Sequence, residues 1–234
     1  MASMDQEEQV LRQSPPSSYP RGSDEFTRVL ALTDGVVAIA ITLLVLNISL
    51  PVPSSDQAAD QAAIGSLLAG LSDQLIAFLV SFVILAYSWV GHHRQISRLA
   101  RIDGLFITWN FGYLLLVAAV PLQSQLIGLY GDNPQALTFY SLEFALLFGW
   151  DWLGTQLAWR RQLMQRLPSR RQRLRITIAR LIPVAVFLAV IPAVHWLGEG
   201  MASWLWVLIW PLEWLLDRLF PPSHAPTGGM SARR

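Results

Sequence analysis

Residues 28–47 read RVLALTDGVVAIAITLLVLN, an apolar run with one carboxylate, Asp34, near its start. Crossing a lipid bilayer takes roughly 20 helical residues, so this run is long enough to form a membrane-spanning helix. A carboxylate costs roughly 2.5–3.5 kcal/mol at the centre of such a helix on insertion scales, and less near the interface. Asp34 therefore needs a polar partner or a water-filled cavity.

Five further apolar runs follow the first. With the first run included, the six apolar runs occupy residues 29–50, 74–91, 105–121, 137–157, 178–197 and 201–220. The second and third runs are short, and residues 62–71 could either begin the second helix or form a separate interfacial helix. Charged residues make up only 14% of the chain, against about 25% in soluble domains. The predicted fold is an all-α integral membrane protein with six transmembrane helices.

The basic residues predict the orientation of these helices. All 17 are arginines, and they fall within residues 12–28, 94–101, 160–180 and 218–234. The connections on the other side, 51–73, 122–136 and 197–200, contain none. Because arginine concentrates in cytoplasmic segments, we expect both termini to be cytoplasmic.

The domain organisation follows from the same pattern. Residues 1–27 and 221–234 are predicted to be disordered cytoplasmic tails, and residues 28–220 to form one transmembrane domain. The arginine-rich loop 160–180 could bind anionic lipid or nucleic acid, but a loop that only sets the topology is favoured. No aromatic residue beyond Trp159 interleaves these arginines over 160–175, so a base-stacking surface is not supported.

The first run has two different faces when drawn as a helix. At 100° per residue, Ile39 and Leu46 lie within about 20° of one line, Leu43 about 40° to one side and Thr42 about 60° to the other. Asp34 lies about 140° from Ile39, almost opposite. One face is thus an apolar stripe with a single hydroxyl. Such a stripe could line a pore, although apolar faces of membrane helices usually meet lipid or other helices.

Polar residues in the next two runs lie at the depth of Asp34. We expect a hydrogen-bonded cluster that joins the first three helices and contains Thr33, Asp34, Trp89, His92, His93 and Asn110. The adjacent histidines could instead bind a metal, but helical metal pairs use i, i+4 spacing, so a metal site is not favoured. For Glu143, Asp151, Glu213 and Asp217, a proton or ion relay and an interfacial placement both remain open.

Residues 28–46 resemble the signature first helix of the prokaryotic transmembrane-protein-175 channel family, which usually reads Arg-x-x-x-Phe-Ser-Asp-Gly. Here Leu32 replaces the phenylalanine and Thr33 the serine, and both keep the apolar or hydroxyl character. Further matches in the second and third helices are Ser81, Phe82, Trp89, His92, His93, Asn110 and Pro121. The close resemblance covers residues 28–121.

This resemblance implies a potassium-permeable, weakly selective cation channel in the plasma (inner) membrane, built as a homotetramer around a central pore lined by the first helix. It implies that Ile39 forms the hydrophobic constriction, that Leu43 and Leu46 form further apolar layers, and that Thr42 provides selectivity. It also implies a structural polar network behind the pore, made of Arg28, Thr33, Asp34, Trp89, His92, His93 and Asn110.

The expected partners are K+ and other monovalent cations, membrane lipid and further copies of the chain, with no nucleic acid. We expect no cofactor and no metal besides permeant K+, and no enzymatic activity, because the sequence contains no catalytic motif. The alternative function is a proton- or cation-coupled secondary transporter. The halves of the chain show no convincing repeat, which weakens that alternative.

Overall fold

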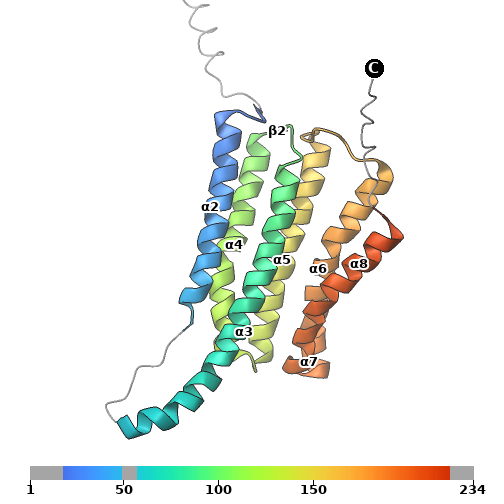
Figure 1. The fold of residues 1–234 in the computed structure, drawn as a ribbon. Coiled ribbons are helices and arrows are strands. Elements are labelled where there is room, and N and C mark those ends of the chain that lie inside the picture. The colour runs from blue at the N-terminus through green and yellow to red at the C-terminus, as the bar shows by residue number, and fades with distance from the viewer. Residues whose placement is uncertain (1–17, 49–56, 222–234) are drawn as a thin grey trace, which may run out of the picture. The chain divides into compact units, whose positions relative to one another are not determined.

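The computed structural model describes residues 18–48 and 57–221, and side chains are described for these residues except 57–70 and 199 (Figure 1). The helices are α2 (Asp24–Leu46), α3 (Gln57–Ile96), α4 (Gly104–Tyr130), α5 (Pro134–Arg160), α6 (Arg170–Leu197), α7 (Glu199–Ser203), η1 (Trp204–Leu208, a 3-10 helix) and α8 (Ile209–Leu219). Two short strands, β1 (Tyr19–Pro20) and β2 (Arg101–Ile102), complete the described structure.

The chain forms two compact units. The first contains the described residues up to Leu129 together with Trp150–Leu167, and the second contains Tyr130–Gly149 with the residues from Pro168 onward. The first unit therefore holds α2, α3 and nearly all of α4, with the end of α5. These helices lie side by side in Figure 1.

Four helices are long and apolar enough to cross a membrane. They are Asp24–Leu46, Leu71–Ile96, Gly104–Tyr130 and Arg170–Leu197. Helix α5 has 27 residues, but Glu143 and Asp151 interrupt its apolar sequence. The count of six membrane spans stays a prediction, while a multi-pass, all-helical membrane fold is clear from these four helices.

The sixth apolar run differs from the single helix expected over 201–220. It is divided among α7, the 3-10 helix η1 and α8. Pro211 gives the physical reason, because it has no N–H to bond the carbonyl of Val207. A proline fits the first turn of a helix, so α8 starts anew at Ile209.

The first helix begins earlier than the sequence indicates. Ser23 caps α2 by accepting a hydrogen bond from the backbone N–H of Phe26 at 3.3 Å, and Asp24 and Glu25 in the first turn suit the positive end of the helix dipole. Residues 18–27 therefore belong to the folded chain, and the predicted boundary of the first tail at residue 27 is wrong. The remainder of both predicted tails, 1–17 and 222–234, lies outside the described residues.

The second and third helices are longer than their apolar runs. Helix α3 starts at Gln57, so residues 62–71 begin the second helix and do not form a separate one. Helix α4 contains Pro121 and continues to Tyr130. Both helices are therefore longer than the roughly 20 residues that are needed to cross a bilayer, although their apolar runs are shorter.

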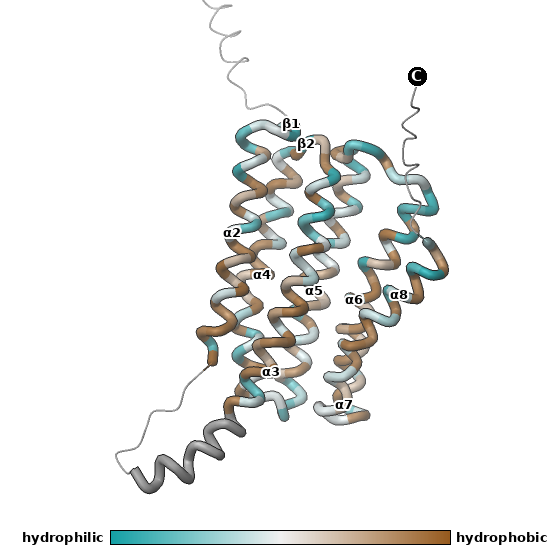
Figure 2. Tube along the Cα trace, in the orientation of Figure 1, coloured by the Kyte–Doolittle hydropathy of each residue, from teal (hydrophilic) through white to brown (hydrophobic). Residues whose placement is uncertain are grey.

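Helix α2 buries one face inside the first unit. Its buried residues recur every three, four or seven positions and are Phe26, Thr33, Val37, Ala40 and Leu44. The helix is nevertheless hydrophobic along most of its length (Figure 2), and a helix that is apolar all round belongs in a membrane or a protein interior. The exposed face of α2 is therefore suited to lipid or to another protein surface.

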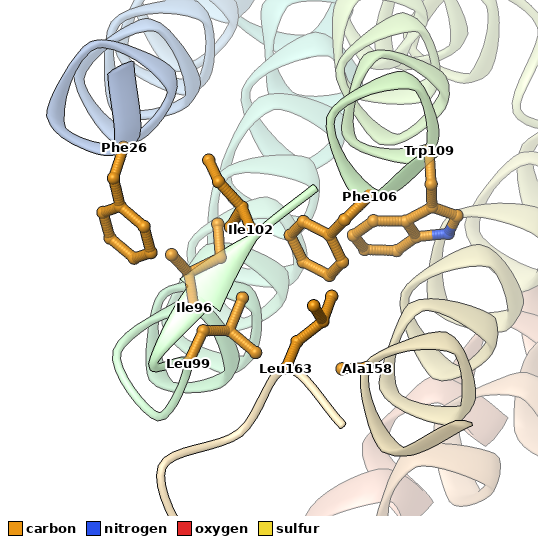
Figure 3. Close-up of a cluster of buried hydrophobic side chains, with 8 residues drawn as sticks. All are labelled: Phe26, Ile96, Leu99, Ile102, Phe106, Trp109, Ala158 and Leu163. Atoms are coloured by element: carbon orange, nitrogen blue, oxygen red, sulfur yellow. The ribbon is translucent and has the colours of Figure 1, made fainter. Parts of the chain in front are cut away.

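A cluster of buried apolar side chains closes the end of the first unit where α2 begins and α3 ends. We call it the end cluster, and it contains Phe26, Ile96, Leu99, Ile102, Phe106, Trp109, Ala158 and Leu163 (Figure 3). Strand β1 pairs with β2 across this end, with Tyr19 opposite Ile102. On the other side, the backbone N–H of Ala100 donates to the carbonyl of Leu163 at 2.7 Å. The α3–α4 connection is thus held from both sides.

A buried ion pair supports the same end. Asp103 is 4% exposed and accepts from the backbone N–H of Phe106 at 2.8 Å, which caps α4. Its other carboxylate oxygen lies 2.8 Å from the guanidinium of Arg161. The start of α4 is therefore fastened to the segment that follows α5.

The second unit has an aromatic core of its own. Phe187 of α6 stacks on Phe144 of α5 with ring centroids 5.3 Å apart, and Tyr140 lies 5.0 Å from the ring of Trp206 in η1. At its surface, Arg175 pairs with Asp217. These contacts hold α6, η1 and α8 together.

Candidate functional site

The carboxylate of Asp34 has partners on α3. The indole Nε1 of Trp89 donates to Asp34 Oδ1 at 2.9 Å, and His93 Nδ1 lies 3.8 Å from the same oxygen. The Trp89 and His93 rings lie 5.3 Å apart, which fits their spacing of one helical turn. The side chains of Asp34 and His93 are 40% and 41% exposed. The need of Asp34 for a polar partner is therefore met by a tryptophan at the predicted depth.

A second set of contacts lies deeper and joins four helices. Asn110 Nδ2 of α4 donates to Thr33 Oγ1 of α2 at 2.8 Å, and Asn110 Oδ1 lies 3.1 Å from His92 Nε2 of α3. His92 Nδ1 lies 2.9 Å from Asp151 Oδ1 of α5. All four residues are at most 5% exposed. We call Thr33, Asn110, His92 and Asp151 the buried polar chain.

Aromatic rings enclose His92. Its imidazole is parallel to the ring of Tyr113 within 1°, with centroids 3.7 Å apart, and the Trp109 ring lies 5.7 Å away. The Tyr113 hydroxyl lies 3.2 Å from Ser88 Oγ. The ring of His92 is therefore held in one orientation.

The structure brings together most of the residues predicted for the polar network, and Asp34, Trp89 and His93 form one group within it. Arg28 does not join. It is exposed at the start of α2, and among the described residues it forms no hydrogen bond or ion pair with the other members. Its place on the exposed side of the helix, five and six residues before Thr33 and Asp34, explains this difference.

Asp151 is the member that sequence reasoning did not assign. Its relay or interfacial placement was left open, yet it is buried directly against His92. One signal was available: Asp151 lies nine residues before Arg160 in the fourth predicted span, toward the end that is predicted to be cytoplasmic and near the depth predicted for His92. Of the other acidic residues, Asp217 is exposed and pairs with Arg175, and its interfacial placement stays a prediction.

The opposite face of α2 carries the residues predicted to line a pore. Ile39, Leu43 and Leu46 are 60%, 40% and 75% exposed. Thr42 is also exposed, and its hydroxyl donates to the carbonyl of Ile39 at 2.8 Å. The helical phase predicted that this apolar stripe lies opposite Asp34, and the structure shows that the stripe is exposed.

A further contact holds the far end of α2. Asn47, the C-cap residue of α2, donates its side-chain amide to the carbonyl of Pro121 in α4 at 2.5 Å. Thr33 and Asn47 are 14 residues apart, so α2 is tied to α4 at two points roughly 21 Å apart along its axis. Within the described residues, no three His, Asp or Glu side chains lie close enough together to hold a metal ion.

These features define a multi-pass helical membrane protein whose first helix is held by side-chain hydrogen bonds from its neighbours. Residues 28–121 match the family model described as endosomal/lysosomal potassium channel TMEM175. The resemblance to the TMEM175 family that the sequence predicts is therefore confirmed over these residues.

Two bacterial relatives are similar in sequence, and both are described as potassium channels. The one from Chamaesiphon minutus is 42% identical over 112 residues, which cover 48% of this chain and 54% of that protein. The one from Streptomyces collinus is 32% identical over 136 residues, which cover 58% of this chain and 64% of that protein. The chain thus spans between half and two thirds of the length of these relatives.

A solved structure is similar over a larger share of the chain. The crystal structure of a lysosomal potassium-selective channel TMEM175 homolog from Chamaesiphon minutus matches with a TM-score of 0.67 and 27% sequence identity. The match covers 86% of this chain and all of that one. The helical fold described above is therefore that of a TMEM175 channel structure.

Proposed function

We propose that this chain is the subunit of a potassium-permeable cation channel whose conduction path is lined by α2. The observation that carries the proposal is the division of α2 into two faces. One face is hydrogen-bonded through Thr33 to the rest of the first unit, and the other exposes a continuous apolar stripe with a single hydroxyl. The descriptions of both bacterial relatives as potassium channels support it.

Ile39 is the proposed constriction. Its side chain is 60% exposed and is the first of the stripe residues, and several copies facing one another would form a narrow apolar collar. Such a collar can close a pore by excluding water. Leu43 and Leu46 would add apolar layers on the side of Asn47.

Thr42 is the proposed selectivity residue. Its hydroxyl proton is used within the helix, because Oγ1 donates to the Ile39 carbonyl. The oxygen therefore presents lone pairs and no proton to the exposed side. A ring of such oxygens could replace part of the hydration shell of a cation next to the apolar collar.

The polar side chains behind α2 have a structural role in this proposal. Asp34 is partnered by Trp89 on the side away from Ile39, so its charge fixes the helix and does not line the path. The buried polar chain and the Asn47–Pro121 hydrogen bond complete this support. Conduction would then be passive and need no cofactor, no bound metal and no catalytic step.

The remaining features concern assembly and location. A single α2 cannot enclose a path, so we propose a homotetramer in which four copies of α2 surround it. The arginine distribution supports cytoplasmic termini in a plasma membrane. Membrane lipid and K+ with other monovalent cations are the proposed partners.

Reconstitution tests the function directly. The purified full-length protein in liposomes under a potassium gradient should give rapid flux and unitary currents in bilayer recordings. Liposomes that carry no protein give the background leak. Slow, saturable exchange without unitary currents would contradict the channel and favour a secondary transporter.

A further inference from the structure

The contacts of the buried polar chain lead from Asp151 of α5 to Thr33 of α2. Thr33 Oγ1 lies 2.8 Å from the carbonyl oxygen of Val29, and Asn110 Nδ2 lies 2.8 Å from Thr33 Oγ1. Asn110 Oδ1 faces His92 Nε2 at 3.1 Å, and His92 Nδ1 faces Asp151 Oδ1 at 2.9 Å. Each of these contacts is a hydrogen bond and needs one proton, which one of its two atoms carries.

The contact between Thr33 and Val29 determines which atom donates in the next hydrogen bonds of the chain. A carbonyl oxygen can only accept, so the proton between Thr33 and Val29 belongs to the Thr33 hydroxyl. The hydroxyl oxygen must then accept from the amide group of Asn110. The amide oxygen of Asn110 is consequently turned toward His92 Nε2, and this nitrogen must carry a proton.

The proton in the contact between His92 and Asp151 follows from the number of protons that a neutral imidazole ring carries. A neutral ring carries one proton, and Nε2 already holds it. The proton between Nδ1 and Asp151 is therefore a second one, and it resides either on the ring or on the carboxyl group. In both forms, His92 and Asp151 together hold two protons and carry no net charge.

The opposite direction of hydrogen bonding fits these contacts less well. In that arrangement, the single proton of the ring lies on His92 Nδ1 and Nε2 is unprotonated. The oxygen and the nitrogen of the Asn110 amide would then exchange positions. Thr33 would then donate to Asn110, so two oxygens would face each other at 2.8 Å without a proton between them. It would also leave the full charge of Asp151 in a site where its side chain is only 7% exposed, and moving a charged carboxylate out of water costs free energy.

We propose that Asp151 is a positioning residue for α2, acting through His92, Asn110 and Thr33. Asp151 holds the His92 ring in the orientation and protonation form whose Nε2–H donates to Asn110, and this directs the Asn110 amide at the first helix. The effect on cation selectivity rests on the proposed function. The proton positions do not depend on it.

Nitrogen NMR of the histidine ring tests the proton positions. The sample is the full-length protein in lipid nanodiscs at pH 7.5, labelled with nitrogen-15 and carrying His93→Gln, His195→Gln and His224→Gln, so that His92 gives the only ring signals. We expect a protonated Nε2. A bare Nε2 with its proton on Nδ1 would overturn the inference.

Two substitutions at Asp151 test the positioning role. In Asp151→Asn, the new amide can donate to Nδ1, so Nε2 should stay protonated and the potassium preference over sodium should be unchanged. In Asp151→Leu, the new side chain offers Nδ1 no hydrogen bond in place of the carboxyl group, so the Nε2 proton should exchange with water faster and the potassium preference should fall several-fold. Asp217→Asn, which neutralises the exposed carboxylate of α8, is the matched control and should change neither.

The possible outcomes separate the two proposals. If Asp151→Leu does not fold, the wild-type protein and Asp151→Asn still decide, because the opposite direction of bonding predicts a bare Nε2 in both. If Asp151→Leu folds and matches Asp151→Asn in both measurements, Asp151 does not position the ring. Wild-type protein without unitary currents would contradict the channel and leave the NMR result standing.

Discussion

Trp109 and Trp150 exchange hydrogen bonds between α4 and α5. Trp109 Nε1 donates to the carbonyl of Trp150 at 3.1 Å, and Trp150 Nε1 donates to the carbonyl of Trp109 at 2.9 Å. Each indole also covers a glycine of the opposite helix. A Cβ atom at Gly112 would lie 2.5 Å from the Trp150 ring, and one at Gly154 would overlap the Trp109 ring. These two helices supply Asn110 and Asp151 to the buried polar chain.

Replacing Gly154 with alanine should loosen this contact. The added methyl group would force the Trp109 indole to move, and overpacking of this kind costs typically 1–3 kcal/mol. We expect a lower thermal midpoint of the detergent-solubilised protein, followed by tryptophan fluorescence. Gly149→Ala on the same helix is the control, because its Cβ meets no atom within 4 Å. Equal midpoints for both variants would contradict the close approach.

Replacing Ile39 with asparagine should wet the proposed collar. A polar side chain of similar size removes the apolar surface that excludes water, so the single-channel conductance or the resting leak should rise. Bilayer recordings of the reconstituted protein measure both. Leu115→Asn, at a residue of α4 that is 73% exposed, is the control for a polar group introduced elsewhere. If Ile39→Asn leaves the currents unchanged, Ile39 is not the constriction.

Replacing Thr42 with alanine should reduce the preference for potassium over sodium several-fold. The change removes the only hydroxyl of the exposed stripe, while Thr42→Ser keeps the hydroxyl and its hydrogen bond to the Ile39 carbonyl. Reversal potentials under biionic conditions measure the preference. The serine variant should behave as the wild type. An unmoved reversal potential in the alanine variant would show that selectivity arises at another residue.

Replacing Asp34 with alanine should impair folding or assembly before it alters selectivity. The change removes the acceptor of the Trp89 hydrogen bond. Because the carboxylate is partly exposed, the loss should be on the order of 1 kcal/mol. Size-exclusion chromatography and the thermal midpoint measure it, with Asp132→Ala in the exposed α4–α5 connection as the control. A fully assembled protein with changed selectivity would contradict the structural role.

Membrane depth explains why part of the site was predictable. The predicted spans and the positions of the arginines assign each residue a depth along the membrane normal. Residues of different helices that share a depth can then be expected to lie near one another. This predicted one cluster of Thr33, Asp34, Trp89, His92, His93 and Asn110, but not which of these residues contact one another. Helical phase added the second coordinate for α2 and separated Ile39 from Asp34.

The rest of the site required the rotation of each helix about its own axis, which depth does not supply. Asp151 could face His92, water or lipid at the same depth. Gly112 and Gly154 have no side-chain pattern that reveals an indole against them. Arg28 lies five residues before Thr33, roughly 7.5 Å along the helix axis, and projects from the exposed side of α2. The division of residues 201–220 among α7, η1 and α8 also depended on the local backbone conformation near Pro211.

The hydrogen bond from Thr42 to the Ile39 carbonyl bears on how subunits come together. The exposed stripe of α2 offers no polar hydrogen that lacks an acceptor, because the hydroxyl of Thr42 is satisfied by its own helix. A newly inserted chain can therefore rest in the bilayer with this stripe against acyl chains. We expect folding of the individual subunit to come first and association to follow as a separate, concentration-dependent step. Dilution into excess lipid should then release folded monomers rather than unfolded chains.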